Sequence, residues 1–81
     1  MNVVIERNYN NRACGVLSDD GMAIRWATEI DWQRNRITIT FFPGNDPILY
    51  ARSQVYSEHF ADAILFEMNR RGALPRKGAR S

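Results

Sequence analysis

The sequence predicts an α+β domain, a small antiparallel β-meander of four to five strands with one C-terminal α-helix packed on one face. Apolar and polar residues alternate through most of the N-terminal part of the chain, as they do in half-buried strands. The dipeptide Asp20-Gly21 lies between two apolar runs, which is typical of a tight hairpin. Only residues 53–72 keep the period of an amphipathic helix over a long stretch. We therefore expect one domain over residues 1–72 and a flexible basic tail over residues 73–81.

The first two predicted strands are short. Residues 3–5 form an apolar run, and the asparagine-rich segment after them favours a turn, because asparagine tolerates left-handed backbone. Residues 13–17 form a second, weaker strand. Gly15 within this strand indicates a bulge or a close approach of another backbone.

Two longer strands follow the Asp-Gly turn. Residues 22–30 alternate with period two, which places Ile24 and Trp26 on the face that the helix covers. Residues 37–42 alternate in the same way and are rich in β-branched and aromatic side chains. The opposite face of the sheet is then expected to carry Arg25, Glu29, Thr38, Thr40 and Phe42.

Two structures fit the segment that follows Asp46. With Asp46 as the N-cap, a helix would start at Pro47 and run on through the predicted helix without a break. Alternatively, residues 48–52 form a strand that closes a third hairpin, and the helix begins at Ser53 or Ser57. We favour the strand, because a single helix starting here would have about twice the mean helix length of ~11–12 residues.

The predicted C-terminal helix has one apolar stripe and a clear end. The stripe consists of residues at the spacing of one helical face, namely Phe60, Ala61, Ile64, Leu65 and Met68. Arginines near the C-terminus suit the negative end of the helix dipole, and Gly72 can end the helix in the left-handed conformation. The far side of the helix should be polar, yet it carries Val55, His59 and Phe66.

Size and composition limit the class of protein. At 81 residues the chain has room for one small core. Its single cysteine, Cys14, excludes an internal disulfide and a zinc site made of four cysteines. No stretch reaches the ~20 apolar residues of a transmembrane helix or resembles a signal peptide. We therefore expect a cytoplasmic protein that does not interact with membranes.

The formal net charge of +2 is unevenly distributed along the chain. Residues 1–69 contain six arginines and nine acidic residues, a net charge of −3. Residues 70–81 contain five basic residues and no acidic one, a net charge of +5. The candidate contacts to nucleic acid are therefore these five cations and three arginines of the sheet region: Arg25, Arg34, Arg36, Arg70, Arg71, Arg76, Lys77 and Arg80.

No combination of residues points to catalysis. Cys14 is the only cysteine and His59 the only histidine, so they are the one possible pair of cysteine nucleophile and histidine base. Cys14 is better explained as a small residue in a strand. His59 and Asp62 have helical spacing but lack the further ligands that a metal ion needs. The sequence contains no glycine-rich phosphate loop and no nucleophile elbow. We therefore expect no enzyme, no cofactor and no metal.

Aromatic and apolar side chains outside the predicted core are the candidates for contact with another protein. They are Trp32, Phe42, Val55, His59 and Phe66. The sequence thus predicts a small non-enzymatic protein-binding module, an adaptor or inhibitor that docks on a larger protein. Such a compact chain is compatible with an origin in a phage or a mobile element. The alternative is a nucleic-acid-binding accessory protein that uses the basic tail and the sheet arginines, and a homodimer is compatible with either function.

Overall fold

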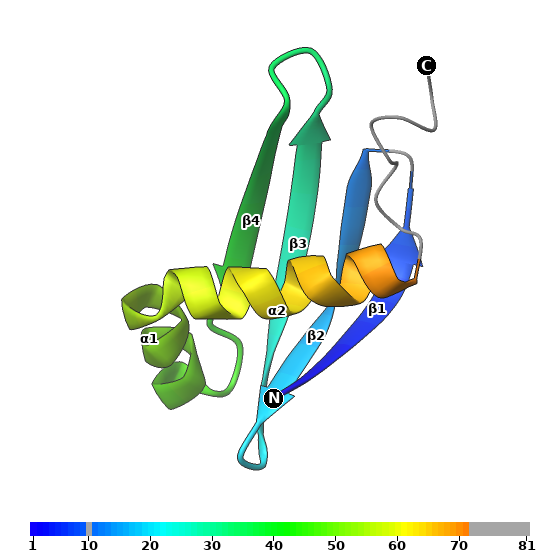
Figure 1. Ribbon diagram of the computed structural model, residues 1–81. Coiled ribbons are helices and arrows are strands. Elements are labelled where there is room, and N and C mark those ends of the chain that lie inside the picture. Colours follow the sequence, from blue (N-terminus) through cyan, green and yellow to red (C-terminus); the bar gives the residue numbers. More distant parts are fainter. Residues whose placement is uncertain (10, 72–81) are drawn as a thin grey trace.

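A sheet of four antiparallel strands and a layer of two helices make up the computed structural model, which describes residues 1–9 and 11–71 (Figure 1). The strands follow one another across the sheet in chain order: β1 (Asn2–Asn8), β2 (Arg12–Asp19), β3 (Met22–Asp31) and β4 (Arg36–Phe42). The helices are α1 (Pro47–Val55) and α2 (Ser57–Arg70). The predicted α+β class and the antiparallel meander are confirmed. The tail predicted over residues 73–81 lies outside the described residues.

The two hairpin turns around β3 have the local chemistry that their sequences predict. Asp20 and Gly21 have φ values of 55° and 78°, as a two-residue turn between antiparallel strands requires. In the turn from β3 to β4, the Asp31 carboxylate accepts hydrogen bonds from the backbone N–H groups of Gln33 (3.1 Å) and Arg34 (3.2 Å). Both turns therefore fix the register of the strands that they join.

Helix α2 runs across one face of the sheet from the β4 side to the β1 side (Figure 1). The predicted stripe is confirmed at its centre, since Phe60, Ile64 and Met68 are buried. The Phe60 ring meets the ring of Phe41 on β4 edge-on, with centroids 5.9 Å apart. The buried side chains of the sheet come from alternate positions and include Val3, Ala13, Leu17, Ile24, Trp26, Thr28, Ile30 and Phe41.

The prediction that residues 48–52 form a strand is wrong, and so is the expectation of a single helix. Pro47 occupies the first turn of α1, and Leu49 and Ser53 lie four residues apart on its buried side. The chain then bends at Tyr56 (φ −111°, ψ 44°), where α2 begins. The bend lets Leu49 enter the same core as Phe60, which a straight helix with one apolar stripe could not do. Residues 48–50 do not continue the apolar stripe of α2, because they belong to a separate helix.

The alternative hypothesis correctly placed the helix start, since Asp46 occupies the N-cap position and α1 begins at Pro47, but the Asp46 side chain makes no capping hydrogen bond. Its Oδ2 atom instead accepts a hydrogen bond from the backbone N–H of Ala23 at 3.0 Å. The loop before α1 is thereby attached to the start of strand β3, and α1 packs against β3 and β4. None of the helices within the described chain is long and apolar enough to cross a membrane.

Candidate binding surfaces

The face of the sheet that turns away from the helices forms the first candidate surface, here called the open face. Strand register brings its side chains into rows, because residues paired across antiparallel strands share a face. The rows consist of Val4, Val16, Arg25 and Phe42; of Arg7, Cys14, Ala27 and Thr40; and of Arg12, Glu29 and Thr38. Arg25, Glu29, Thr38, Thr40 and Phe42 are all exposed, as the alternation predicts.

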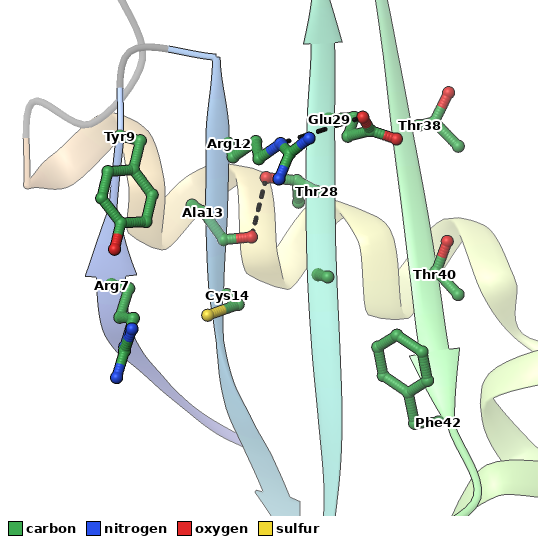
Figure 2. A pocket seen from close by; sticks show the side chains of 11 residues that line it. Arg7, Tyr9, Arg12, Ala13, Cys14, Thr28, Glu29, Thr38, Thr40 and Phe42 are labelled. Carbon is green, nitrogen blue, oxygen red and sulfur yellow. Dashed lines mark hydrogen bonds and ion pairs between the residues drawn. The ribbon is translucent and has the colours of Figure 1, made fainter.

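A hollow of about 520 Å³ lies in the middle of the open face. Its floor is low because the central strands contribute the small side chains of Cys14 and Ala27. Figure 2 shows Arg7 and Tyr9 on the β1 side of the hollow. On the β4 side lie Thr38, Thr40 and Phe42, so both walls combine polar groups with an aromatic ring (Figure 2).

The charges of the open face are partly paired. Arg25 donates a hydrogen bond to the Glu6 carboxylate at 2.8 Å, and Arg12 lies 4.0 Å from the Glu29 carboxylate. All four side chains are well exposed, so each pair contributes little to stability. Arg7 forms no ion pair with any other described residue. The open face therefore offers guanidinium groups to an anionic or polar partner.

The outer side of α1 forms the second candidate surface, here called the α1 surface. It is a shallow apolar groove lined by Pro47, Ile48, Ala51, Arg52, Val55 and Tyr56. Val55 is 73% exposed, and Ile48 and Tyr56 are also largely exposed. Leu49 and Ser53 on the opposite side of the helix are completely buried. Helix α1 thus carries apolar residues on two sides, only one of which the core uses.

Carboxylates border the α1 surface where α2 begins. A second depression continues from Val55 and Tyr56 over the first turns of α2, along Glu58, His59 and Asp62. Its lining is mainly polar, whereas the lining of the α1 surface is mainly apolar. A partner that covers both would need apolar side chains at the centre and basic side chains at this border.

The five predicted protein-contact residues lie in four places. Val55 and His59 line the same depression at the junction of α1 and α2. Phe66 is 68% exposed further along α2, Trp32 lies in the turn between β3 and β4, and Phe42 is on the open face. Sequence reasoning missed Ile48 and Tyr56. The i, i+3, i+7 spacing of Ile48, Ala51 and Val55 would have revealed the groove if the segment had been assigned to a helix.

The predicted nucleic-acid contacts that the structure describes do not form one basic stripe. Arg25 lies on the open face, whereas Arg34 lies in the β3–β4 turn with its Nε atom 3.8 Å from the Asp31 carboxylate. Arg36 is exposed at the start of β4. Arg76, Lys77 and Arg80 lie outside the described residues. Arg7 and Arg12, which line the hollow, were not predicted, because the faces of the first two strands could not be assigned from their weak alternation.

The last two predicted cations of the described chain are held at the C-terminal end of α2. Arg70 and Arg71 both contact the Glu67 carboxylate, at 2.8 and 2.7 Å. The hydrogen bond from Arg70, together with that from Arg71, lowers the pKa of Glu67 to about 2. The same hydrogen bond raises the pKa of Arg70. These two arginines therefore pair with a carboxylate of their own helix at the end of α2.

The catalytic and metal-binding candidates are dispersed over the molecule. Cys14 lies on the open face, whereas His59 lies in the helix layer, so the sheet separates them. Within residues 1–9 and 11–71, no group of three or more His, Cys, Asp or Glu side chains is arranged to hold a metal ion. Cys14 is a half-buried thiol in the floor of the hollow.

Comparisons of the chain with protein-family models, with curated proteins and with solved structures find no match. The chemistry of the two surfaces is therefore the guide to function. The open face combines arginine, threonine and aromatic side chains, and the α1 surface combines apolar side chains with a border of carboxylates. Neither surface is an enclosed cavity.

Proposed function

We propose that this protein is a small binding module without catalytic activity that docks onto a larger protein through the α1 surface. The observation that carries the proposal is the exposed apolar side of α1, opposite the side that enters the core. An exposed cluster of large apolar residues marks an interaction site more often than an isolated one does. Ile48, Val55 and Tyr56 form such a cluster within ten residues of chain.

The border of the α1 surface indicates the kind of partner. Glu58 and Asp62 extend from the groove along α2, and residues 1–69 as a whole have a net charge of −3. Complementary charge favours the correct orientation and accelerates association. The partner surface should therefore present apolar side chains flanked by lysine or arginine. An adaptor or an inhibitor would act by covering such a surface on a larger protein.

The experiment compares three immobilised proteins in affinity capture from the source cells. They are the wild type, Val55→Asp, and the control Phe66→Asp, which places the same charge at an equally exposed apolar position of the other helix. We expect a protein that the wild type and Phe66→Asp retain and that Val55→Asp loses. Circular dichroism melts confirm that both variants fold. Identical capture by all three proteins would exclude the α1 surface as the docking site.

The open face supports a second candidate function, the binding of single-stranded nucleic acid. Proteins with this function stack bases on aromatic side chains and hold the backbone with arginine. Tyr9 and Phe42 flank the hollow, with Arg7 and Arg12 beside them. The test is a titration with a fluorescent oligonucleotide at rising salt, with wild type, Arg7→Ala and a chain truncated after Gly72. Binding that weakens in Arg7→Ala supports the open face, whereas binding lost only on truncation assigns the contact to the tail.

A further inference from the structure

The outer edge of β4 has no backbone partner among the described residues. Strand β4 ends the sheet and pairs only with β3, so one of its edges presents unpaired N–H and C=O groups. Its pairing with β3 is continuous from Phe42 back to Arg36, without a bulge. Between Ile37 and Phe42 the strand contains neither a charged residue nor a proline. An edge with these properties is a template for another strand.

The opposite edge of the sheet is protected in the usual ways. Strand β1 has an irregular register between Ile5 and Arg7, where Glu6 is left without a partner on β2. Glu6 and Arg7 also bring charges to this edge. Bulges and charges both discourage pairing between sheets. The sheet therefore has one blocked edge and one open edge.

Apolar side chains accompany the open edge on both faces of the sheet. Ile37 is 39% exposed although it lies on the same face of β4 as the buried Phe41. Phe42 is 44% exposed on the open face. Both side chains would lose water contact if the sheet continued beyond β4.

We propose that two copies of this chain pair through their β4 edges, in antiparallel orientation and with a two-fold axis at Ile39, so that two four-stranded sheets become one. Antiparallel pairing about Ile39 places Ile37 opposite Phe41 of the second copy and Thr38 opposite Thr40 of the second copy. Arg36 then lies opposite Phe42 of the second copy. An axis perpendicular to the sheet leaves both helix layers on the same side.

The sequence of β4 is complementary to itself in this register. The pair of Ile37 with Phe41 extends the apolar core between the copies, and the pair of Thr38 with Thr40 joins two small hydroxyl side chains. Arg36 opposite Phe42 allows a guanidinium group to lie against an aromatic ring. This register places no two like charges opposite each other. A second copy of the chain is therefore the partner that fits this edge. The pairing uses the backbone of β4 and no residue of the α1 surface, so it is independent of the proposed docking function.

The register can be tested with two double variants at exposed positions of the open face. In Thr38→Lys/Thr40→Lys, each lysine would lie opposite a lysine of the second copy, so the dimer would contain two such pairs of like charges. In Thr38→Lys/Thr40→Glu, each lysine would oppose a glutamate. Position 38 pairs with Glu29 on β3 within one chain, so lysine is tolerated there in both variants. Both variants carry lysine at position 38 and differ only at position 40, which the proposed register places opposite position 38 of the second copy.

Sedimentation velocity over a concentration series measures the dimer dissociation constant of each protein. We expect a wild-type dimer, a roughly tenfold larger dissociation constant for the Lys/Lys variant, and a wild-type or smaller constant for the Lys/Glu variant. Circular dichroism melts confirm that both variants fold. A wild type that stays monomeric at its highest soluble concentration would overturn the proposal. Equal effects of the two variants would overturn it as well, because they would show that positions 38 and 40 do not face each other.

Discussion

Gly15 on β2 lies so close to the backbone carbonyl oxygen of Val4 on β1 that no side chain fits between them. A Cβ atom built on Gly15 would overlap this oxygen and would lie 3.0 Å from the indole ring of Trp26. The close approach occurs beside the irregular step of β1, where Ile5 pairs with Gly15 and the register then shifts before Arg7. The glycine therefore allows β1 to bend over β2 and allows Trp26 to fill the core.

Replacement of Gly15 by alanine should destabilise the fold by about 1–3 kcal/mol, because the new methyl group forces either β1 or the Trp26 ring to move. The matched control is Gly44→Ala. Gly44 has a left-handed φ of 50° but open space around it, so only backbone strain of about 1 kcal/mol opposes that change. Urea denaturation of the three proteins measures the difference. Equal losses at the two positions would contradict the close approach at Gly15.

The strands could be predicted from the sequence because each element carries its own signal. Alternation identified β3 and β4, and Asp20-Gly21 identified the turn between β2 and β3. Gly15 was expected to mark a bulge or a close approach, and the structure shows both around it. These features depend on local backbone and on the period of the side chains, which a single sequence contains.

Helix α1 could not be predicted in the same way. The run of Ile48, Leu49 and Tyr50 suits a strand as well as a helix, and its helical character depends on the contact of Leu49 with the core. The helical period predicted over residues 53–72 correctly placed Phe66 and Val55 outside the core, but Val55 belongs to α1, and the α1 surface depends on the bend at Tyr56. The hollow depends on the register between strands, which aligns the small side chains of Cys14 and Ala27. Neither the bend nor the hollow can be deduced from the local sequence.

The two phenylalanines of α2 should respond very differently to truncation. Phe60 is buried against Phe41, so Phe60→Ala should cost about 3–5 kcal/mol through lost burial and the cavity that remains. Phe66 is exposed, so Phe66→Ala should change stability by less than about 0.5 kcal/mol. Both variants remove the same atoms from the same helix. Thermal and urea unfolding compare them, and similar losses would mean that α2 is rotated relative to the structure described.

The hydrogen bond from the Ala23 backbone N–H to Asp46 should stabilise the attachment of α1 to the sheet. Asp46→Ala removes the acceptor and should lower the free energy of unfolding by about 0.5–1.5 kcal/mol. Asp46→Asn keeps an acceptor oxygen at the same place and should retain most of the stability. Hydrogen exchange at the Ala23 amide provides a local readout, because its protection should fall in Asp46→Ala and persist in Asp46→Asn. Unchanged protection in the alanine variant would show that this contact does not hold the loop.

The Glu67 contacts predict a specific dependence of stability on pH. The pKa of Glu67 falls from 4.5 to about 2 in the folded chain because the ionised carboxylate accepts hydrogen bonds from Arg70 and Arg71. Between these two values the unfolded chain binds more protons than the folded chain does. The stabilising contribution of Glu67 is therefore fully present above about pH 4.5 and is lost as the pH falls towards about 2.

Replacement of Glu67 by glutamine removes this titration while keeping a side chain of nearly the same shape. Urea denaturation of the wild type and Glu67→Gln at a series of pH values isolates the effect, since the two proteins differ only at this side chain. The wild type should be more stable at neutral pH, and its advantage should shrink between about pH 4.5 and about pH 2. Because both arginine contacts lie near the surface, added salt should reduce the advantage at neutral pH. Parallel pH profiles of the two proteins would show that Arg70 and Arg71 do not hold the Glu67 carboxylate in solution.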